Sequence, residues 1–260
     1  MFDRPIDLKQ ARILLTNDDG IEARGLKLLH KVARGLCRDV WVVAPELEQS
    51  GASHSLTLHR PLRARRLGPR RFAVDGTPTD CVLLALKNLI RDRRPTLVIS
   101  GINGGANLGD DVTYSGTVAA AMEATLLGVP AIALSMTYRD RSKIQWATAE
   151  RHAPEVIRRL VAQPWPKNTL INVNFPDLPA AEVKGIVVAR QGRHKIGDQL
   201  MERMDPRGRP YYWIGPIRET DDSVDGTDIS EITKGQITLT PILLDLTNTS
   251  VLGALRKVFT

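Results

Sequence analysis

Short apolar runs alternate with segments of helical period along the first half of the chain. The apolar runs predict buried strands at residues 12–16, 40–44, 96–100 and 130–135. Apolar positions with a period of about 3.6 predict helices between them, over about residues 26–37, 77–90 and 117–127. Alternation of strand and helix at this spacing predicts an α/β fold with a parallel sheet and helices on both of its faces.

Helix signals are strongest at residue 77. Thr77 can serve as an N-cap, Pro78 suits the first helical turn, and Asp80 completes a capping pattern. A later helix is expected over about residues 148–162, where Pro154 should limit or kink it.

The pattern changes in the last third of the chain. Strands are expected at residues 170–175, 183–189 and 236–242, followed by a short closing helix. Residues 190–235 are polar and rich in Gly, Pro and Asp, with one clear strand at residues 210–215. That is too long for a loop, so it should have extended structure of its own or pack on another subunit. We therefore expect one domain over residues 1–260, with a core at about 12–189 and 236–260 and an extended arm at about 190–235.

Composition narrows the class of protein. A chain of 260 residues with two cysteines can bury a core without disulfides. Cys37 and Cys81 lie in apolar helical patterns and match no zinc spacing, which favours a reducing compartment. The N-terminus is charged where a signal peptide would be apolar, and no run reaches the roughly 18 apolar residues of a membrane span. We expect a soluble, cytoplasmic protein without a membrane partner.

The net charge of +7 raises the question of an anionic partner. The densest basic run consists of Arg60, Arg63, Arg65, Arg66, Arg70 and Arg71. It has no aromatic residue before Phe72, whereas a surface that binds single-stranded nucleic acid needs aromatic side chains for base stacking as well as basic ones. A solvated hairpin turning at Gly68 and a general attraction for phosphorylated ligands both fit, and no specific nucleic-acid partner is expected because no helix-turn-helix or zinc pattern is present.

Polar residues follow the carboxyl ends of the predicted strands. Open parallel sheets bind their ligands at these ends. Asp18 and Asp19 end the first strand, Ser50 follows the second, and Asn103 and Asn107 follow the third, before Ser115, Gly116 and Thr117. These loops should open into one crevice.

Two adjacent carboxylates repel each other unless a divalent cation or an arginine lies between them. With Ser50 and Asn103 as further ligands of Asp18 and Asp19, all donors would be oxygen, which favours Mg²⁺, Mn²⁺ or Ca²⁺. The alternatives stay open. The aspartates could instead interact with the dipole of a helix beginning near Ile21, and Ser50 and Asn103 could be turn residues.

A second ion site is indicated at Ser115, Gly116 and Thr117, which open a helix of small residues. Free backbone N–H groups, two hydroxyls and the helix dipole favour an anion such as phosphate, although an N-cap without a ligand also fits. A cation site and an anion site facing one crevice would describe a metal-bridged phosphate. The motifs of dinucleotide-binding oxidoreductases, P-loop ATPases and nucleophile-elbow hydrolases are absent. His54 is as easily packed as catalytic.

The same segments resemble a known family. The matching motifs are ILLTNDDGIEARGL, VVAPELEQSGASHSLT, DGTPTDCV, SGINGGANLGDDVTYSGTVAAAMEA, DPRGRPYYWIGP and GTDISEITKGQITLTPI, which cover about residues 12–245. They resemble the SurE family, the stationary-phase survival protein E group of metal-dependent nucleotidases.

The resemblance implies a Rossmann-like fold and hydrolysis of nucleoside 5′- and 3′-monophosphates. It implies one divalent ion per subunit, Mg²⁺ or Mn²⁺, with Ca²⁺ able to replace it in a crystal. It also implies a homodimer or homotetramer built partly through an extended C-terminal hairpin. Carried over by motif, the metal ligands are Asp18, Asp19, Ser50 and Asn103, and the phosphate contacts are Asn107, Ser115, Gly116 and Thr117.

Our hypothesis for the mechanism is that Asp18 and Asp19 hold the ion and that Asp19 orients or deprotonates the attacking water. Two alternatives use the same site: a broad phosphatase or exopolyphosphatase, and a nucleotide-binding regulator without catalysis. A basic nucleic-acid-binding protein is a further alternative from another class.

Overall fold

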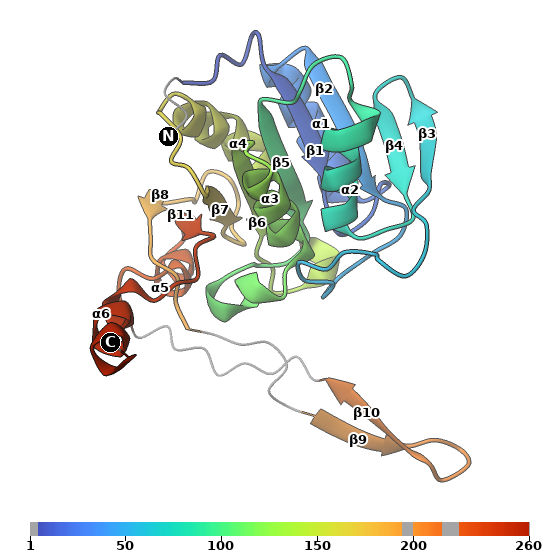
Figure 1. The fold of residues 1–260 in the computed structure, drawn as a ribbon, viewed down its shortest axis with the longest axis vertical. Coiled ribbons are helices and arrows are strands. Elements are labelled where there is room, and N and C mark those ends of the chain that lie inside the picture. Colours follow the sequence, from blue (N-terminus) through green and yellow to red (C-terminus); the bar gives the residue numbers. More distant parts are fainter. Residues whose placement is uncertain (1–4, 194–199, 215–223, 260) are drawn as a thin grey trace.

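A computed structural model describes residues 5–193, 200–214 and 224–259 of the chain. Within these residues nine strands form one sheet in the order β3-β4-β2-β1-β5-β6-β7-β11-β8 (Figure 1). The central strands run parallel and follow the predicted apolar runs. They are β1 (Arg12–Thr16), β2 (Asp39–Pro45), β5 (Leu97–Asn103), β6 (Ala131–Met136) and β7 (Thr169–Phe175).

The outer strands make the sheet mixed. At one edge β4 (Arg71–Val74) is parallel to β2, and β3 (Ala64–Gly68) is antiparallel to β4. At the other edge β11 (Gln236–Leu243) is antiparallel to β7, and β8 (Gly185–Val188) is parallel to β11. The predicted α/β class and parallel core are confirmed, with antiparallel pairs added towards the edges.

Helices cover both faces of the sheet, as predicted (Figure 1). Ile13 and Leu15 of β1 belong to a buried cluster with α1 (Arg24–Leu36) and α4 (Trp146–Val161). The intervening Leu14 belongs to a second cluster with α2 (Pro78–Leu84) and α3 (Gly116–Leu126). Successive side chains of a strand point to opposite faces, so one short apolar run supplies both halves of the core.

Short helical turns connect or extend these elements. They are the π-helical turn Ala85–Leu89 after α2 and the 3₁₀ turns Gly109–Thr113 and Arg141–Lys143. The closing helix α6 (Thr249–Phe259) follows β11. In the described part of the chain no helix is both long and apolar enough to cross a membrane.

Two helix boundaries differ from the predictions. Helix α1 begins at Arg24 rather than near Ile21, because Gly20 has a φ of +98° and the Ile21 N–H bonds to the Pro45 carbonyl at 2.7 Å. Helix α4 begins at Trp146 and runs through Pro154 to Val161. Proline therefore removes one backbone donor from α4 without ending it.

The segment predicted as an arm, residues 190–235, has three described parts. Strand β9 (Leu200–Met204), which the sequence analysis missed, pairs antiparallel with the expected β10 (Pro210–Ile214), and all ten residues are exposed. Figure 1 shows this hairpin extending away from the sheet. Helix α5 (Asp228–Thr233) instead has four buried residues, packs against β11 and shares a small apolar cluster with Leu108, while the boundaries of the arm stay a prediction. Residues 194–199 and 215–223 lie outside the described residues.

The arginine-rich run forms the expected hairpin, β3 and β4. Several of its guanidinium groups have acidic partners, for example Arg65 with Glu46 at 2.5 Å and Arg71 with Glu22 at 2.7 Å. These partners partly neutralise the basic run, which agrees with a solvated hairpin.

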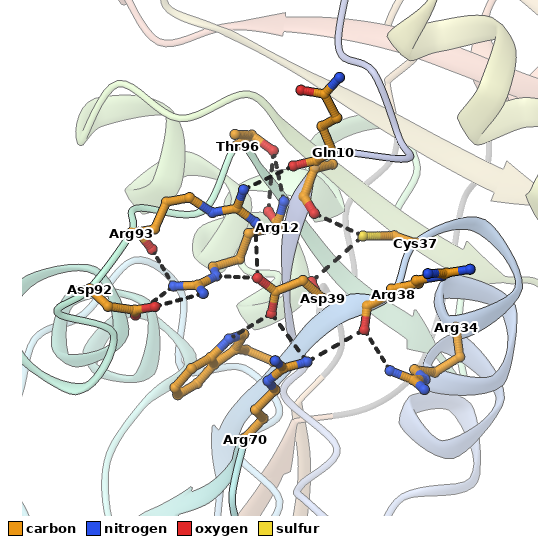
Figure 2. A network of polar contacts seen from close by, with 12 residues as sticks. Gln10, Arg12, Arg34, Cys37, Arg38, Asp39, Arg70, Asp92, Arg93 and Thr96 are labelled. Carbon is orange, nitrogen blue, oxygen red and sulfur yellow. Dashed lines mark hydrogen bonds and ion pairs between the residues drawn. The ribbon is translucent and has the colours of Figure 1, made fainter.

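Arg12 organises a charged network at the amino ends of β1 and β2 (Figure 2). Its side chain is 7% exposed and bonds to Asp39 at 2.7 Å and to Asp92 at 2.6 Å. Burial alone would raise the pKa of Asp39, but the hydrogen bond and charge of Arg12 hold that pKa below its ordinary value. The hydrogen bond from Arg12 lowers the pKa of Asp92 to about 2.

Replacing Arg12 by methionine should destabilise the fold by about 2 kcal/mol near pH 7, because Asp39 loses one charged hydrogen-bond partner while it keeps Arg70 and Arg93. The lowered pKa values mean that this stability is present above pH 3.8 and is lost as the pH falls through the folded-state values. Urea unfolding of both proteins should therefore show a gap that closes between about pH 4 and pH 2. A gap that is constant over this range would rule out the ion pairs as its cause.

Candidate active site

The carboxyl ends of β1 and β5 meet where the strand order reverses. From β1 the chain passes to β2 on one side and later to β5 on the other. Open α/β sheets bind ligands at such a switch point, because the loops leaving the two strands diverge there. Asp18 and Asp19 leave β1 at this point, and Asn103 ends β5.

Asp18 lies between the end of β1 and the start of α3. It is 4% exposed, and its Oδ1 accepts a hydrogen bond from the Thr117 hydroxyl. A Cβ added to Gly116 would lie 2.8 Å from the Cβ of Asp18 and 3.0 Å from its Oδ2. Only glycine at position 116 therefore lets the first turn of α3 approach the carboxylate this closely.

The Asp18 carboxyl lies where negative charge is costly. Burial raises its pKa to about 6, with a further contribution from the charge of Asp19, although the Thr117 hydrogen bond opposes the rise. Within the described residues neither Asp18 nor Asp19 has an ion-pair partner, and Arg141 acts on Asp19 only through space. The site therefore holds two neighbouring carboxyls whose charge no cation among the described residues neutralises by direct contact.

Asp19 is the more accessible of the two. Its Oδ2 accepts a hydrogen bond of 3.2 Å from the Gly104 N–H, which ties the end of β1 to the loop after β5. Burial raises its pKa, and the charge of Glu48 adds to the rise, while the Gly104 bond and Arg141 oppose it. Asp19 also lines a pocket of about 330 Å³, so it can contact a molecule bound there.

Helix α3 begins where the sequence analysis placed an anion site. Ser115 is its N-cap, and the Ser115 Oγ accepts the Val118 N–H at 3.1 Å. The anionic group in contact with this helix start is the carboxyl of Asp18. The alternative that Asp18 and Asp19 interact with the dipole of the helix after β1 is wrong about the helix, because α1 starts only at Arg24. The positive end that Asp18 meets is that of α3.

Asn107 is held by a buried amide network. Its N–H donates to Asn174 Oδ1 at 2.9 Å, and its carbonyl accepts from Asn172 and Asn174 at 2.8 and 3.0 Å. Its side-chain amide donates to the Ser135 hydroxyl at 2.7 Å. Asn172 and Asn174 were not among the predicted site residues, although two amides at alternate positions of a mostly apolar strand indicate that both point to one face.

Asn103 and Ser50 are less closely engaged. The Asn103 side chain is half-buried and donates to the Gly105 carbonyl at 3.0 Å, which leaves its amide oxygen as a candidate donor to a cation. Ser50 is exposed and donates to Glu48 at 2.8 Å; in the described part of the chain it has no hydrogen bond to either aspartate. The Gln49 N–H bonds to the Asp18 carbonyl at 2.8 Å, so Ser50 follows a residue attached to the site.

His54 is directed elsewhere. Its Nε2 lies 3.0 Å from Glu123 Oε2 on α3, and the neighbouring Ser53 hydroxyl donates to the Thr113 carbonyl at 2.7 Å. These contacts fasten the loop after β2 to the region around α3. They favour the packed interpretation of His54 over a catalytic one.

The donors at this edge suit a hard cation. Among the described residues no three His, Cys, Asp or Glu side chains form a group that could hold a metal ion. Any ion here would therefore be bound by the two carboxylates together with hydroxyl, amide or water oxygens. Such all-oxygen sets fit Mg²⁺, Mn²⁺ or Ca²⁺, and a cation would neutralise the buried charge of Asp18 and Asp19.

Comparison with known proteins gives a consistent result. The family model described as "Survival protein SurE" matches residues 13–198. A "5'-nucleotidase SurE" of Paramagnetospirillum magneticum is 58% identical over 99% of each chain, and one of Rhodospirillum rubrum is 55% identical over 100% of each. The crystal structure of a SurE protein from Aquifex aeolicus superposes with a TM-score of 0.84 at 38% identity, covering 96% of this chain and 100% of that one.

Proposed function

This chain belongs to the SurE family, and from that premise we propose that it is a 5′-nucleotidase that requires a divalent metal ion. It hydrolyses nucleoside 5′-monophosphates, and also 3′-monophosphates, to nucleoside and phosphate. The names of the relatives support the nucleotidase activity. The metal requirement is supported by one observation above all: Asp18, buried and next to Asp19, has no cationic partner among the described residues.

In this proposal Asp18, Asp19, Ser50 and Asn103 hold the ion. When bound, the ion supplies charge neutralisation at the phosphoryl oxygens and lowers the pKa of water. Thr117 fixes the orientation of Asp18 through its hydroxyl hydrogen bond. Asp19, which faces the pocket, orients the attacking water or accepts its proton.

The start of α3 and Asn107 complete the phosphate site. The positive end of α3 lies beside Asp18, so a phosphate bridging the ion and this helix would gain from both. Ser115, Gly116 and Thr117 are expected to contact it. The backbone N–H and carbonyl of Asn107 are already bonded to Asn174 and Asn172, so the second N–H of its side-chain amide, which Ser135 holds in place, is the group expected to contact phosphate.

We also propose that the chain forms a homodimer or homotetramer through the β9–β10 hairpin. Exposed apolar side chains support this, because a long apolar hairpin surface is a common partner surface. They are Leu200, Met201, Met204, Tyr211, Tyr212, Trp213 and Ile214. The cytoplasmic location stays a prediction.

Phosphate release from the nucleoside 5′- and 3′-monophosphates tests this function. We expect turnover of AMP that EDTA abolishes and that added Mg²⁺ or Mn²⁺ restores, because the two carboxylates cannot hold the phosphoryl group without a cation. p-Nitrophenyl phosphate and tripolyphosphate measured in parallel separate a nucleotidase from a broad phosphatase or an exopolyphosphatase. Turnover that is unchanged in EDTA would refute the metal requirement, and nucleotide binding without phosphate release would identify a regulator.

A further inference from the structure

The lining of the pocket beside Asp19 includes neither Asp18 nor the helix start that Asp18 contacts. It is formed by the start of α1, the loop after β5 and the segment that leads into α4. Its lining includes Asp19, Arg24, Glu48, Gly104, Arg141 and Trp146. At about 330 Å³ it lies at the lower end of the range for small-molecule sites. The ion and phosphate sites proposed above use neither Arg24 nor Trp146, which form one wall of this pocket.

The wall formed by Arg24 and Trp146 presents two planar groups, a guanidinium and an indole. Trp146 is the first residue of α4, and the Arg24 guanidinium lies over its indole at 5.8 Å from the ring centre. The indole edge lies close to two glycines: a Cβ added to Gly25 would lie 3.2 Å from it, and one added to Gly104 would lie 3.7 Å from it. Trp146 is therefore a half-buried aromatic surface in the pocket, next to backbone that carries no side chain.

The charges in the pocket leave Arg24 available. Arg141 pairs with Glu48 at 3.5 Å, so these two exposed side chains largely neutralise each other. Arg24 forms no ion pair within the described residues, and its contact is the one with the Trp146 ring. A planar cation without a carboxylate partner, next to an indole, can stack on a flat heteroaromatic ring.

We propose that this pocket binds the nucleobase of the substrate, with Trp146 as the stacking surface and Arg24 as a second planar group. The proposal rests on the nucleotidase function given above. Asp19 connects the two halves of the site, since it neighbours Asp18 and also lines the pocket. Gly104 joins the two halves as well, since its N–H bonds to Asp19 and it lies next to the Trp146 indole, so a nucleotide with its phosphate at the carboxylates can place its base against Trp146. Stacking tolerates every base, so this subsite separates nucleotides from other phosphate esters rather than one base from another.

Adenosine is the appropriate probe, because it carries the base without the phosphate and is not hydrolysed. Isothermal titration of the full chain should show adenosine binding, while ribose should not bind. Trp146→Ala should weaken adenosine binding about five- to hundredfold, the range expected for loss of one base-stacking side chain. Trp146→Phe keeps an aromatic face and should retain most of the affinity. Equal adenosine affinity in the wild type and Trp146→Ala, or no adenosine binding at millimolar concentration, would overturn the proposal.

Kinetics provide a second readout that separates this proposal from the nucleotidase function. Ribose 5-phosphate carries the same phosphate and sugar as AMP but no base. Trp146→Ala should lower the ratio of kcat/KM for AMP to that for ribose 5-phosphate by about tenfold or more, mainly through KM. An unchanged ratio would overturn the base subsite and leave the nucleotidase function standing. A wild-type protein that binds adenosine at Trp146 but releases no phosphate from AMP would support the subsite and refute the nucleotidase function.

Discussion

Replacing Asp18 by asparagine is expected to reduce metal-dependent turnover of AMP by about three orders of magnitude or more. Asparagine has the same shape and can still accept the Thr117 hydrogen bond, but it brings no charge to the ion. The fold should survive, because the raised pKa of Asp18 shows that its ionised form is costly where it lies. In EDTA at neutral pH the variant should therefore be at least as resistant to heat as the wild type.

Two further variants complete this experiment. Asp19→Asn should also lose turnover by orders of magnitude, since Asp19 is the second proposed ligand and faces the pocket. Asp245→Asn removes the same charge from an exposed position after β11 and should leave turnover unchanged. Full activity in Asp18→Asn or in Asp19→Asn would refute the ligand role of that residue.

Replacing Gly116 by alanine is expected to lower turnover about hundredfold. The added methyl would lie 2.8 Å from the Asp18 Cβ and 3.2 Å from the Pro78 ring, and neither neighbour is the end of a flexible chain. Either Asp18 or the start of α3 must move, and a displacement of about 1 Å is enough to disrupt an ion and phosphate site. Steady-state kinetics and thermal unfolding together measure this effect.

The control for that substitution is Gly35→Ala in α1, where nothing lies within 4 Å of an added Cβ. This change should leave turnover intact and raise stability slightly, because alanine favours helix. If Gly116→Ala keeps turnover within a few-fold of the wild type, the close approach of α3 to Asp18 has no importance for the reaction.

The first half of the fold was predictable because local signals agree there. The capping pattern at Thr77 is present in full: its hydroxyl accepts the Asp80 N–H, and the Asp80 carboxylate accepts the Thr77 N–H. Strands β1, β5 and β6 are buried along their length or nearly so, and therefore read as continuous apolar runs.

Other elements could not be predicted from local pattern. β9 (LMERM) lacks the aromatic residues that mark β10 (PYYWI), and because all its residues are exposed it has no buried face to mark it either. The antiparallel direction of β11 depends on its pairing with β7, and hydrophobic periodicity carries no information about direction. The start of α1 depends on a hydrogen bond from Ile21 to Pro45, 24 positions away.

The candidate site shows the same division. Asp18, Gly116 and Thr117 were predicted for the site because they follow the carboxyl ends of strands, and the structure brings these three residues into contact. It does not bring Ser50 into contact with the aspartates among the described residues. Trp146 and Arg24 were not predicted. They lie at the starts of two different helices, α4 and α1, and only the packing of these helices brings the two side chains together.

A crystal of this protein grown or soaked with Mn²⁺ tests the central claim most directly, because the anomalous signal of manganese locates the ion without assumption. The account predicts one strong peak at the carboxyl ends of β1 and β5, about 2.1 Å from oxygens of both Asp18 and Asp19. A manganese peak elsewhere, or two aspartates that turn apart towards solvent with no ion between them, would contradict it.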